Sequence, residues 1–418
     1  MKLLLANSTA YPTIGGVENS LLFIAKELMR QGHTVRIMAF RFKQNDPTYI
    51  EHDGIPIYRY DRTCERWPHR QFSSISKAAQ IAFKDLIRIY TPDAVWSRSA
   101  PVGLGIRQAG YKGPLLQIFP TNAKMNCRGL FFHTQGLPLK RRLLFLGLWP
   151  LAYTANKNVE NSLATQCTAV AFSENMRQQL IKDFPPSVTE CHVIFPGVDH
   201  TRFSPESGTH YIKTIEKQYG LDRREPYVLY VGRLSTAKNI PLLIRAICKL
   251  KDRVKLLLVG SGPEEARLKT FAGKNGVADR VVFVGTQDQM LPGFYAISHV
   301  TVLPTIIESF GQVYLESLAC GTPAVGFGGD GHRVMTATQE IIRDGFTGSV
   351  VAPTTGEALA AGIASILDQN EGDYSTMSRQ CREHVVKRFT WRQFVERALA
   401  LSSKGEEYIT KESNGVTT

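Results

Sequence analysis

Two carboxylates and two cations in the second half of the sequence have the types and spacing of a site for a phosphorylated ligand. Glu308 and Glu316 lie in the segment PTIIESFGQVYLE, which directly follows the apolar run 300–303. Arg233 and Lys238 lie in the segment VGRLSTAKN, which overlaps the end of the apolar run 227–231. Arginine binds a diphosphate through its planar fork, and lysine binds it as a point charge. These residues predict an anion site at the ends of two strands.

The spacing Ser309-x-x-Gln312 is typical of a capping box and predicts a helix that begins at Phe310. Glu308 would then precede a helix N-terminus, whose free N–H groups attract an anion, and Glu316 would lie about two turns inside the helix. Two carboxylates so placed can hold two ends of an extended ligand through its hydroxyl groups. The alternative is that none of these residues binds a ligand. Glu308 would then be an ordinary carboxylate of the first helical turn, Glu316 a solvated helix residue and Lys238 a residue of a surface loop.

Two glycine-containing turns are weaker candidates for phosphate contact. The turn around Gly260 and Gly262 lacks the third glycine of a dinucleotide fingerprint and predicts a tight turn into a helix. Gly15 and Gly16 either bring backbone N–H groups close to a phosphate or form a flexible turn. The sequence has no Asp-x-Asp triplet, phosphate-binding P-loop or His-x-x-x-His pair, so we expect neither a metal nor a cofactor.

The elements around these residues follow a β-α-β pattern that starts twice. Strands at 2–6 and 34–40 flank a helix at 17–31, and further apolar runs lie at 94–96, 115–119, 169–172 and 193–195. The second series of strands lies at 227–231, 254–259, 280–284, 300–303 and 324–327. We predict an α/β fold of two tandem Rossmann-like, doubly wound domains that face each other across a cleft, with ligands at the carboxyl ends of the strands.

The length of 418 residues fits this two-domain prediction. We place the join within 203–211, where Pro205, Ser207 and Gly208 cluster, which gives domains 1–206 and 207–389. A C-terminal helix at 390–402 is expected to complete the first domain, and 403–418 is expected to be a loosely ordered tail.

Charge and composition point to an anionic partner and a reducing compartment. The net charge is +13, and residues 94–159 contain no acidic side chain. The seven cysteines include no Cys-x-x-Cys pair, which favours the cytoplasm. The longest apolar run, 143–153, is about half of the roughly 20 residues that span a bilayer.

Together these motifs resemble the retaining glycosyltransferases of family four, which have the two-domain GT-B fold. The matching pieces span most of the chain: Gly15-Gly16-Val17-Glu18, Pro196-Gly197-Val198-Asp199, Gly232-Arg233 with Lys238, Glu308-Ser309-Phe310-Gly311 with Leu315-Glu316, and Gly321-Thr322-Pro323. The resemblance implies transfer of a sugar from a nucleotide-sugar to an acceptor hydroxyl with retention at the anomeric carbon.

The resemblance also implies roles for individual residues. Arg233 and Lys238 would bind the donor diphosphate and stabilise the leaving nucleotide, and Glu308 would contact the donor sugar. Further donor contacts would come from the backbone N–H groups of Phe310 and Gly311 near the sugar, Glu316 on the ribose, Gln287 beside the base, and Gly16 near the diphosphate. Gly15, Gly262 and Ser309 complete the expected donor-binding set.

Two features depart from the family's pattern. Members commonly carry a histidine at the end of a first-domain strand, but residues 119–122 read FPTN, and His133 lies downstream. The segment 328–338 before Glu340 is longer than usual. A loop there could reach the donor or the neighbouring domain.

The basic segment of the first domain suggests membrane contact. Lys140, Arg141 and Arg142 precede an apolar run that contains Trp149, so this segment could lie in a membrane interface with its cations on anionic headgroups. The alternative is a buried helix with a basic cap. We therefore expect a cytoplasmic protein, peripheral on the inner face of the membrane.

We predict a metal-independent, retaining glycosyltransferase of the hexosyl or N-acetylhexosaminyl type. Its donor would be a UDP- or GDP-sugar, and its acceptor a lipid-linked or saccharide acceptor in envelope polysaccharide synthesis. The alternatives are a GT-B-fold sugar-nucleotide epimerase or phosphorylase, and a non-catalytic nucleotide-sugar-binding subunit that scaffolds a partner enzyme. A nucleic-acid binder fits the charge, but the aromatic residues near the basic run show no stacking pattern.

Overall fold

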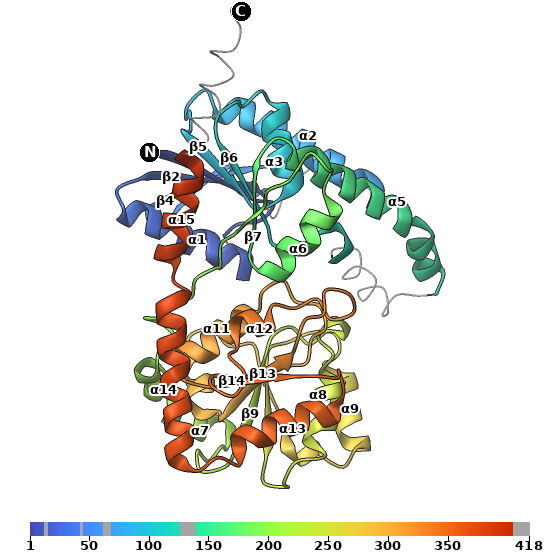
Figure 1. Cartoon of the computed structure of the whole chain (residues 1–418), viewed down its shortest axis with the longest axis vertical. Coiled ribbons are helices and arrows are strands. Elements are labelled where there is room, and N and C mark those ends of the chain that lie inside the picture. Colours follow the sequence, from blue (N-terminus) through green and yellow to red (C-terminus); the bar gives the residue numbers. More distant parts are fainter. Residues whose placement is uncertain (12–15, 42–44, 62–67, 126–138, 404–418) are drawn as a thin grey trace, which may run out of the picture. The chain divides into compact units, whose positions relative to one another are not determined.

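The chain forms two compact units (Figure 1). The computed structural model describes residues 1–11, 16–41, 45–61, 68–125 and 139–403. Of these, residues up to 196 and the C-terminal helix α15 (Trp391–Ser403) belong to the first unit, and residues 197–390 to the second. The predicted tail 403–418 lies outside the described residues, apart from Ser403 at the end of α15.

The boundary between the units lies after residue 196, not at the predicted residue 206. The residues that suggested a linker instead begin helix α7 (Pro205–Tyr219). The N–H of Ser207 donates to the Ser204 hydroxyl, and the N–H of Ser204 donates to the Ser207 hydroxyl, both at 3.1 Å. Proline in the first turn and a serine cap are typical of helix starts, so the same residue types fit a helix start as well as a linker.

The first unit is built on an eight-stranded sheet in the order β3-β4-β2-β1-β5-β6-β7-β8, parallel except for the edge strand β3. The edge hairpin β3-β4 was not predicted, because neither strand is a continuous apolar run. In β3 (YIEH) no side chain is fully buried, and in β4 (IPIYRY) only every second side chain is buried. The strands are β1 (Lys2–Ala6), β2 (Thr34–Phe40), β3 (Tyr49–His52), β4 (Ile55–Tyr60), β5 (Ala94–Ser97), β6 (Leu115–Phe119), β7 (Thr168–Ala171) and β8 (His192–Val193).

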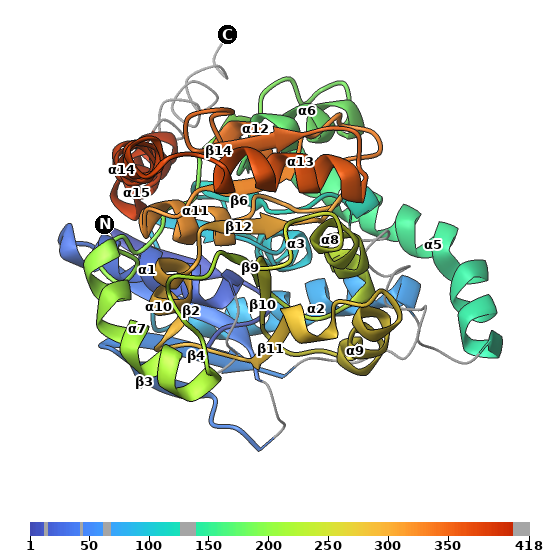
Figure 2. The ribbon, with the colours of Figure 1, turned by 90° about the horizontal axis from the view of Figure 1, so that it is seen from below.

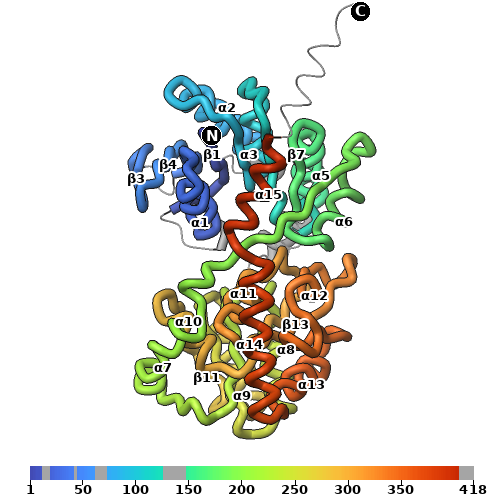
Figure 3. Tube along the Cα trace, turned by 60° about the vertical axis from the view of Figure 1, so that its left-hand side comes forward, coloured from blue at the N-terminus to red at the C-terminus, as the bar shows by residue number. Residues whose placement is uncertain are grey.

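Helices cover both faces of this sheet (Figure 3). On one face, α2 (Pro68–Leu86) and α3 (Ala100–Gln108) bury a core that includes Met38, Phe83 and Val95. Trp96 points to the other face, where its indole N–H donates to the Ser402 hydroxyl of α15 at 2.8 Å. Beside α15 lies α1 (Gly16–Arg30), and the unit also contains α5 (Leu139–Ala164) and α6 (Glu174–Asp183).

The second unit has a six-stranded, all-parallel sheet in the order β11-β10-β9-β12-β13-β14. Figure 2 shows α8, α9 and α13 on one side of it and α7, α10 and α11 on the other. The last strand, β14, was not predicted, because it is short and begins with a glycine. The strands are β9 (Tyr227–Val231), β10 (Lys255–Val259), β11 (Val281–Gly285), β12 (Val300–Leu303), β13 (Ala324–Phe327) and β14 (Gly348–Val351).

The helices of the second unit are α7, α8 (Ile240–Ile247), α9 (Glu265–Lys274), α10 (Leu291–Ile297), α11 (Gln312–Ala319), α12 (Thr338–Ile341), α13 (Gly356–Leu367) and α14 (Glu371–Arg388). Because all six strands are parallel, their carboxyl ends share one edge, and the loops that leave this edge carry the predicted site. In the described part of the chain, no helix is both long and apolar enough to cross a membrane.

Candidate active site

Lys238 and Glu308 meet at the carboxyl edge of the second unit's sheet. Lys238 ends the short 3-10 helix η2 (Thr236–Lys238) after β9, and Glu308 lies in the loop after the neighbouring strand β12. The Nζ of Lys238 lies 2.6 Å from the Oε2 of Glu308. The side chains are 29% and 20% exposed, so this pair is sheltered but open to solvent. The two segments that the sequence singled out are therefore in direct contact.

Asn239 joins the same two loops and was not predicted as a site residue. Its side-chain amide donates to the carbonyl oxygen of Pro304 at 3.2 Å. Its φ of 53° lies in the left-handed region, which asparagine tolerates better than most residues. The sequence signal for this conformation was an asparagine directly after Lys238, between a turn and a helix. Its hydrogen bond holds the loop of Lys238 against the loop of Glu308.

The long loop after β13 also lies against Glu308. The N–H of Glu308 donates to the Met335 carbonyl at 2.9 Å, and the N–H of Met335 donates to the Ile306 carbonyl at 2.7 Å. Within this loop, the Asp330 carboxylate accepts from three backbone N–H groups, which lowers its pKa. The longer-than-usual segment is thus an ordered turn that contacts the segment of Glu308.

The predicted capping box at Ser309 is wrong. Helix α11 begins at Gln312, and its N-cap is Gly311 with φ 99°, a conformation that favours glycine. The Gln312 side chain does not return to the N-cap, but donates to the Gly197 carbonyl at 2.6 Å. Phe310 is buried and its ring lies 6.1 Å from that of Phe389. The start of α11 is therefore set by a left-handed glycine and a long-range hydrogen bond.

Glu316 is neither two turns inside the helix nor solvated. It is the fifth residue of α11, and its Oε2 accepts a hydrogen bond from the Tyr295 hydroxyl at 2.7 Å. Burial raises the pKa of Glu316 to about 7, although the Tyr295 hydroxyl and the charge of Arg202 oppose this shift. Tyr295, on α10, was missed because no local spacing links it to Glu316. The carboxylate lies partly desolvated, with a hydroxyl donor beside it.

This shift predicts a pH-dependent stability. Since the pKa in the fold exceeds the ordinary value of 4.5, the folded state binds the proton more tightly, and the free energy of unfolding falls as pH rises from about 4.5 to about 7. We expect ionisation of Glu316 to lower the free energy of unfolding by about 1 to 3 kcal/mol between these two pH values. In Glu316→Gln, urea unfolding midpoints at pH 5 and pH 8 should differ less than in the wild type. Equal differences in the two proteins would contradict this environment for Glu316.

Gly262 allows two strand-end loops to touch. A Cβ atom at this position would lie 2.2 Å from the carbonyl oxygen of Leu234, and the N–H of Leu234 donates to the Ser261 carbonyl at 2.9 Å. The loop after β10 thereby supports the loop that carries Arg233 and Lys238. The structure thus gives Gly262 a packing role, and its predicted contact with the donor stays a prediction.

Gly262→Ala should lower the free energy of unfolding by about 2 to 3 kcal/mol, because the backbone of Leu234 must move. The matched control is Gly273→Ala on α9, where the added Cβ would have no atom within 4 Å apart from its chain neighbours and the backbone of its own helix. An alanine there should stabilise the helix by about 0.5 to 1 kcal/mol. Calorimetric melting of both variants measures the contrast. Equal melting temperatures would show that the loops do not need this close contact.

The other predicted donor contacts of the second unit lie on loops at the same edge. Arg233 follows β9 and its side chain is exposed. Gln287 follows β11 and its amide donates to the Tyr219 hydroxyl at 2.7 Å. Arg202, also missed as a site residue, donates to the Asp288 carbonyl at 2.7 Å and to its carboxylate at 2.5 Å. Among the described residues, no group of His, Cys, Asp and Glu side chains is arranged to hold a metal ion.

Several of the residues predicted for the first unit lie outside the part of the chain that the structure describes. Gly16 is the first residue of α1, whereas Gly15 and the side chains of Lys140, Arg141 and Arg142 lie outside the described residues. Trp149, on α5, stacks on Tyr153 with 5.8 Å between ring centroids.

Asn122 occupies the stretch where the family's histidine was expected. Its Oδ1 accepts from the N–H of Met125 at 2.8 Å, and the next N–H, of Ala123, donates to Glu160 at 3.0 Å. Burial raises the pKa of Glu160 to about 8. The turn after β6 is thus anchored by a buried asparagine and a buried carboxyl group, and His133 lies outside the described residues.

Comparisons with known proteins agree with this architecture. The chain is 29% identical over 378 residues to the GDP-mannose-dependent alpha-(1-6)-phosphatidylinositol monomannoside mannosyltransferase of Mycolicibacterium smegmatis, which covers 87% of this chain and 89% of the relative. Its fold resembles that of sucrose-phosphate synthase from Thermosynechococcus elongatus, with a TM-score of 0.78, 22% identity, and 96% and 98% of the two chains covered. It also resembles Anabaena HepE in complex with UDP and glucose, with a TM-score of 0.70, 20% identity, and 96% and 100% covered.

These structural neighbours confirm the predicted GT-B arrangement of two parallel-sheet domains. Two family models match successive parts of the sequence: Glycosyltransferase Family 4 matches residues 14–202, and Glycosyl transferases group 1 matches residues 212–384. The first model covers the strands of the first unit from β2 onward, and the second covers all six strands of the second unit. The chain belongs to the family 4 glycosyltransferases.

Proposed function

We propose that this glycosyltransferase moves a hexosyl or N-acetylhexosaminyl group from a UDP- or GDP-sugar to an acceptor hydroxyl, with retention at the anomeric carbon and without a metal. The observation that carries the proposal is the 2.6 Å contact between Lys238 and Glu308 at the carboxyl edge of the second unit's sheet. It places a cation and a carboxylate where parallel sheets bind their ligands.

The two side chains have complementary tasks in this reaction. The bond between the anomeric carbon and the diphosphate oxygen breaks, a bond to the acceptor oxygen forms, and the proton of the acceptor hydroxyl passes to the departing diphosphate oxygen. Negative charge then builds on the leaving diphosphate, and a preorganised cation stabilises it. Lys238, helped by Arg233, supplies that positive charge in the proposal. Glu308 accepts hydrogen bonds from hydroxyls of the donor sugar, and Glu316 accepts those of the ribose.

The acceptor is proposed to be lipid-linked or a saccharide of an envelope glycan. The name of the mycolicibacterial relative describes a GDP-mannose donor and a phosphatidylinositol-linked acceptor, and HepE was solved with UDP. These names support both UDP- and GDP-sugars as donors, so the test must include both.

Product analysis tests the proposal. The purified protein is incubated in EDTA with UDP-glucose, UDP-N-acetylglucosamine or GDP-mannose, with and without a membrane lipid extract, and nucleotide release and the product's anomeric configuration are measured. Acceptor-dependent release with the donor's α configuration retained is expected. Inversion of configuration, or a strict need for a divalent metal, would contradict the proposed reaction. Tight nucleotide-sugar binding without any turnover would favour the non-catalytic subunit instead.

We also propose peripheral membrane contact through the start of α5. Lys140, Arg141 and Arg142 precede Trp149 and Leu151, and Leu151 is 56% exposed. Replacing the three cations by glutamate should remove an attraction of about 1 kcal/mol each to anionic lipid. Sedimentation with vesicles rich in phosphatidylserine should then fall at least tenfold. Unchanged sedimentation would refute the contact.

A further inference from the structure

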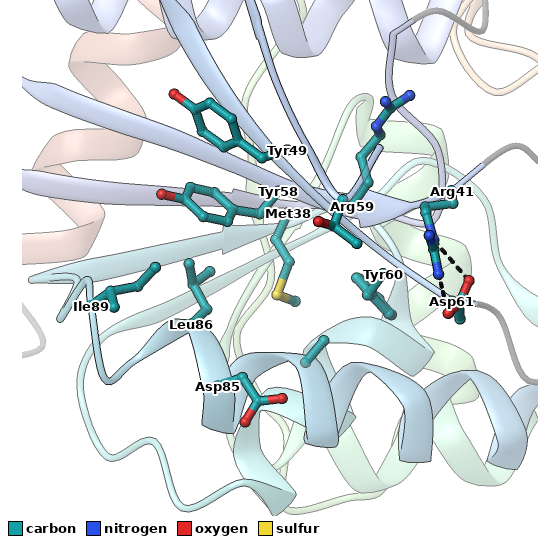
Figure 4. A pocket seen from close by; sticks show the side chains of 12 residues that line it. Met38, Arg41, Tyr49, Tyr58, Arg59, Tyr60, Asp61, Asp85, Leu86 and Ile89 are labelled. Atoms are coloured by element: carbon teal, nitrogen blue, oxygen red, sulfur yellow. Dashed lines mark hydrogen bonds and ion pairs between the residues drawn. The ribbon is translucent and has the colours of Figure 1, made fainter. Parts of the chain in front are cut away.

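The first unit contains a cavity of about 380 Å³ between the edge of its sheet and helix α2. Figure 4 shows Met38 and Tyr58 projecting from the strands and Leu86 and Ile89 facing them from α2 and the turn after it. Side chains of the edge hairpin β3-β4 line the cavity on one side, and side chains of α2 line it on the other. The volume lies in the range of pockets for small ligands, roughly 300–1,000 Å³.

The cavity has one polar end. Arg41 and Asp61, which directly follow β2 and β4, form a bidentate ion pair there (Figure 4): the Nε of Arg41 donates to one carboxylate oxygen at 2.8 Å, and its Nη2 donates to the other. These residues lie at the carboxyl edge of the sheet, where ligands of such sheets bind. The opposite end is bounded by Tyr49 and Ile89. The cavity thus extends from the polar carboxyl edge of the sheet to an end lined by large side chains. We call this cavity the slot.

Four of the polar side chains that line the slot, Arg41, Tyr58, Asp61 and Asp85, have partners within the protein. The hydroxyl of Tyr58 accepts from Arg36 at 3.1 Å, and Arg41 and Asp61 bond each other. Asp85 is 69% exposed and lies 3.8 Å from Arg88. In the described part of the chain, two lining residues carry a buried polar atom without a hydrogen-bond partner, the hydroxyl of Tyr60 and the Nε of Arg59. A sugar ring, which needs several hydrogen bonds, would be poorly satisfied in such a slot, whereas a hydrocarbon chain would be well accommodated.

Two of the large apolar side chains that line this slot are exposed to solvent. Tyr49 is 45% exposed and Ile89 is 64% exposed, and both line the cavity. Large apolar side chains left in water beside an apolar cavity are typical of a binding site for an apolar ligand.

We propose that this slot binds the hydrocarbon chain of the lipid acceptor, with the chain's polar end at Arg41 and Asp61 and its methylenes between Met38, Tyr58, Leu86 and Ile89. This inference rests on the proposed function, since it selects the lipid-linked acceptor over the free saccharide. It assigns to the first unit a chain-binding role that the donor site of the second unit does not require.

Binding of n-alkyl β-glucosides tests the slot without any need for turnover. Hexyl, octyl and decyl glucosides are titrated calorimetrically below their critical micelle concentrations, with glucose as the chain-free reference. Each buried methylene should raise the affinity about fourfold until the cavity is filled. Affinity that is independent of chain length, or glucose binding as tightly as octyl glucoside, would overturn the proposal.

A filled-cavity variant locates the binding. Ala82 lines the slot from α2, so Ala82→Phe should abolish the chain-length dependence, whereas Ile81→Phe, on the same helix but outside the lining, should preserve it. Chain-length dependence that survives Ala82→Phe would also overturn the proposal. Circular dichroism checks the fold of both variants.

The two proposals fail separately. If the wild type transfers sugar but binds alkyl glucosides without chain-length dependence, the slot is refuted and the transferase function stands. If the chains bind as expected but no donor is turned over, the proposed function fails instead.

Discussion

Glu308→Gln is expected to lower the turnover number by about 10²- to 10³-fold, while the dissociation constant of the nucleoside diphosphate changes little. The amide keeps the shape of the side chain but loses the negative charge that lies 2.6 Å from Lys238. It also loses an acceptor for hydroxyls of the donor sugar, which the free nucleotide lacks. Steady-state kinetics with the cognate nucleotide-sugar and calorimetric titration of the diphosphate measure the two quantities.

The second unit offers a matched control for this change. Glu225 pairs with Lys255 at 2.5 Å, with side-chain exposures of 33% and 28%. Lys255 begins β10, so this pair lies at the opposite, amino edge of the sheet. Glu225→Gln should leave turnover close to that of the wild type. If Glu308→Gln retained wild-type turnover, or lost no more than Glu225→Gln, Glu308 would not take part in the reaction.

Lys238→Met should reduce kcat/KM by about 10²- to 10³-fold and should also weaken binding of the nucleoside diphosphate. Unlike Glu308→Gln, it removes a charge that attracts the diphosphate in the ground state and stabilises it as it leaves. Lys255→Met is the control, since it breaks an ion pair of similar length and exposure away from the site. The proposal would be contradicted by equal diphosphate affinity in Lys238→Met and the wild type.

The double variant distinguishes a functional pair from two independent residues. Residues that act as a unit in one transition state give losses that are far from additive. Glu308→Gln combined with Lys238→Met should therefore lose little more turnover than the worse single variant. Multiplicative losses would mean that the 2.6 Å contact has no catalytic importance.

Much of the fold was predictable because its central strands are continuous apolar runs. The sequences LLLA in β1 and YVLYV in β9 are buried along nearly their whole length, as parallel strands covered on both faces require. The edge hairpin β3-β4 escaped prediction because only one of its faces is covered. The domain boundary was misplaced because serine and proline serve linkers and helix starts equally well.

The part of the site that could be predicted consists of charged residues that come soon after a strand in the sequence. Lys238 and Glu308 come after β9 and β12, which are neighbours in the sheet, so their meeting follows from the strand order. The start of α11 was wrong, because it depends on the left-handed Gly311 and on a hydrogen bond from Gln312 to Gly197, distant in sequence. The raised pKa of Glu316 depends on burial beside Tyr295, which no local pattern reveals.

A thermal-shift titration of nucleoside diphosphates in EDTA tests the central claim most directly. A ligand that binds the native state raises the melting temperature in proportion to RT ln(1 + [L]/Kd). We predict that UDP or GDP, but not both equally, raises the melting temperature in EDTA, and that the rise is lost in Lys238→Met and kept in Lys255→Met. No rise with either diphosphate, or an equal rise in Lys238→Met, would contradict a metal-free donor site built around Lys238 and Glu308.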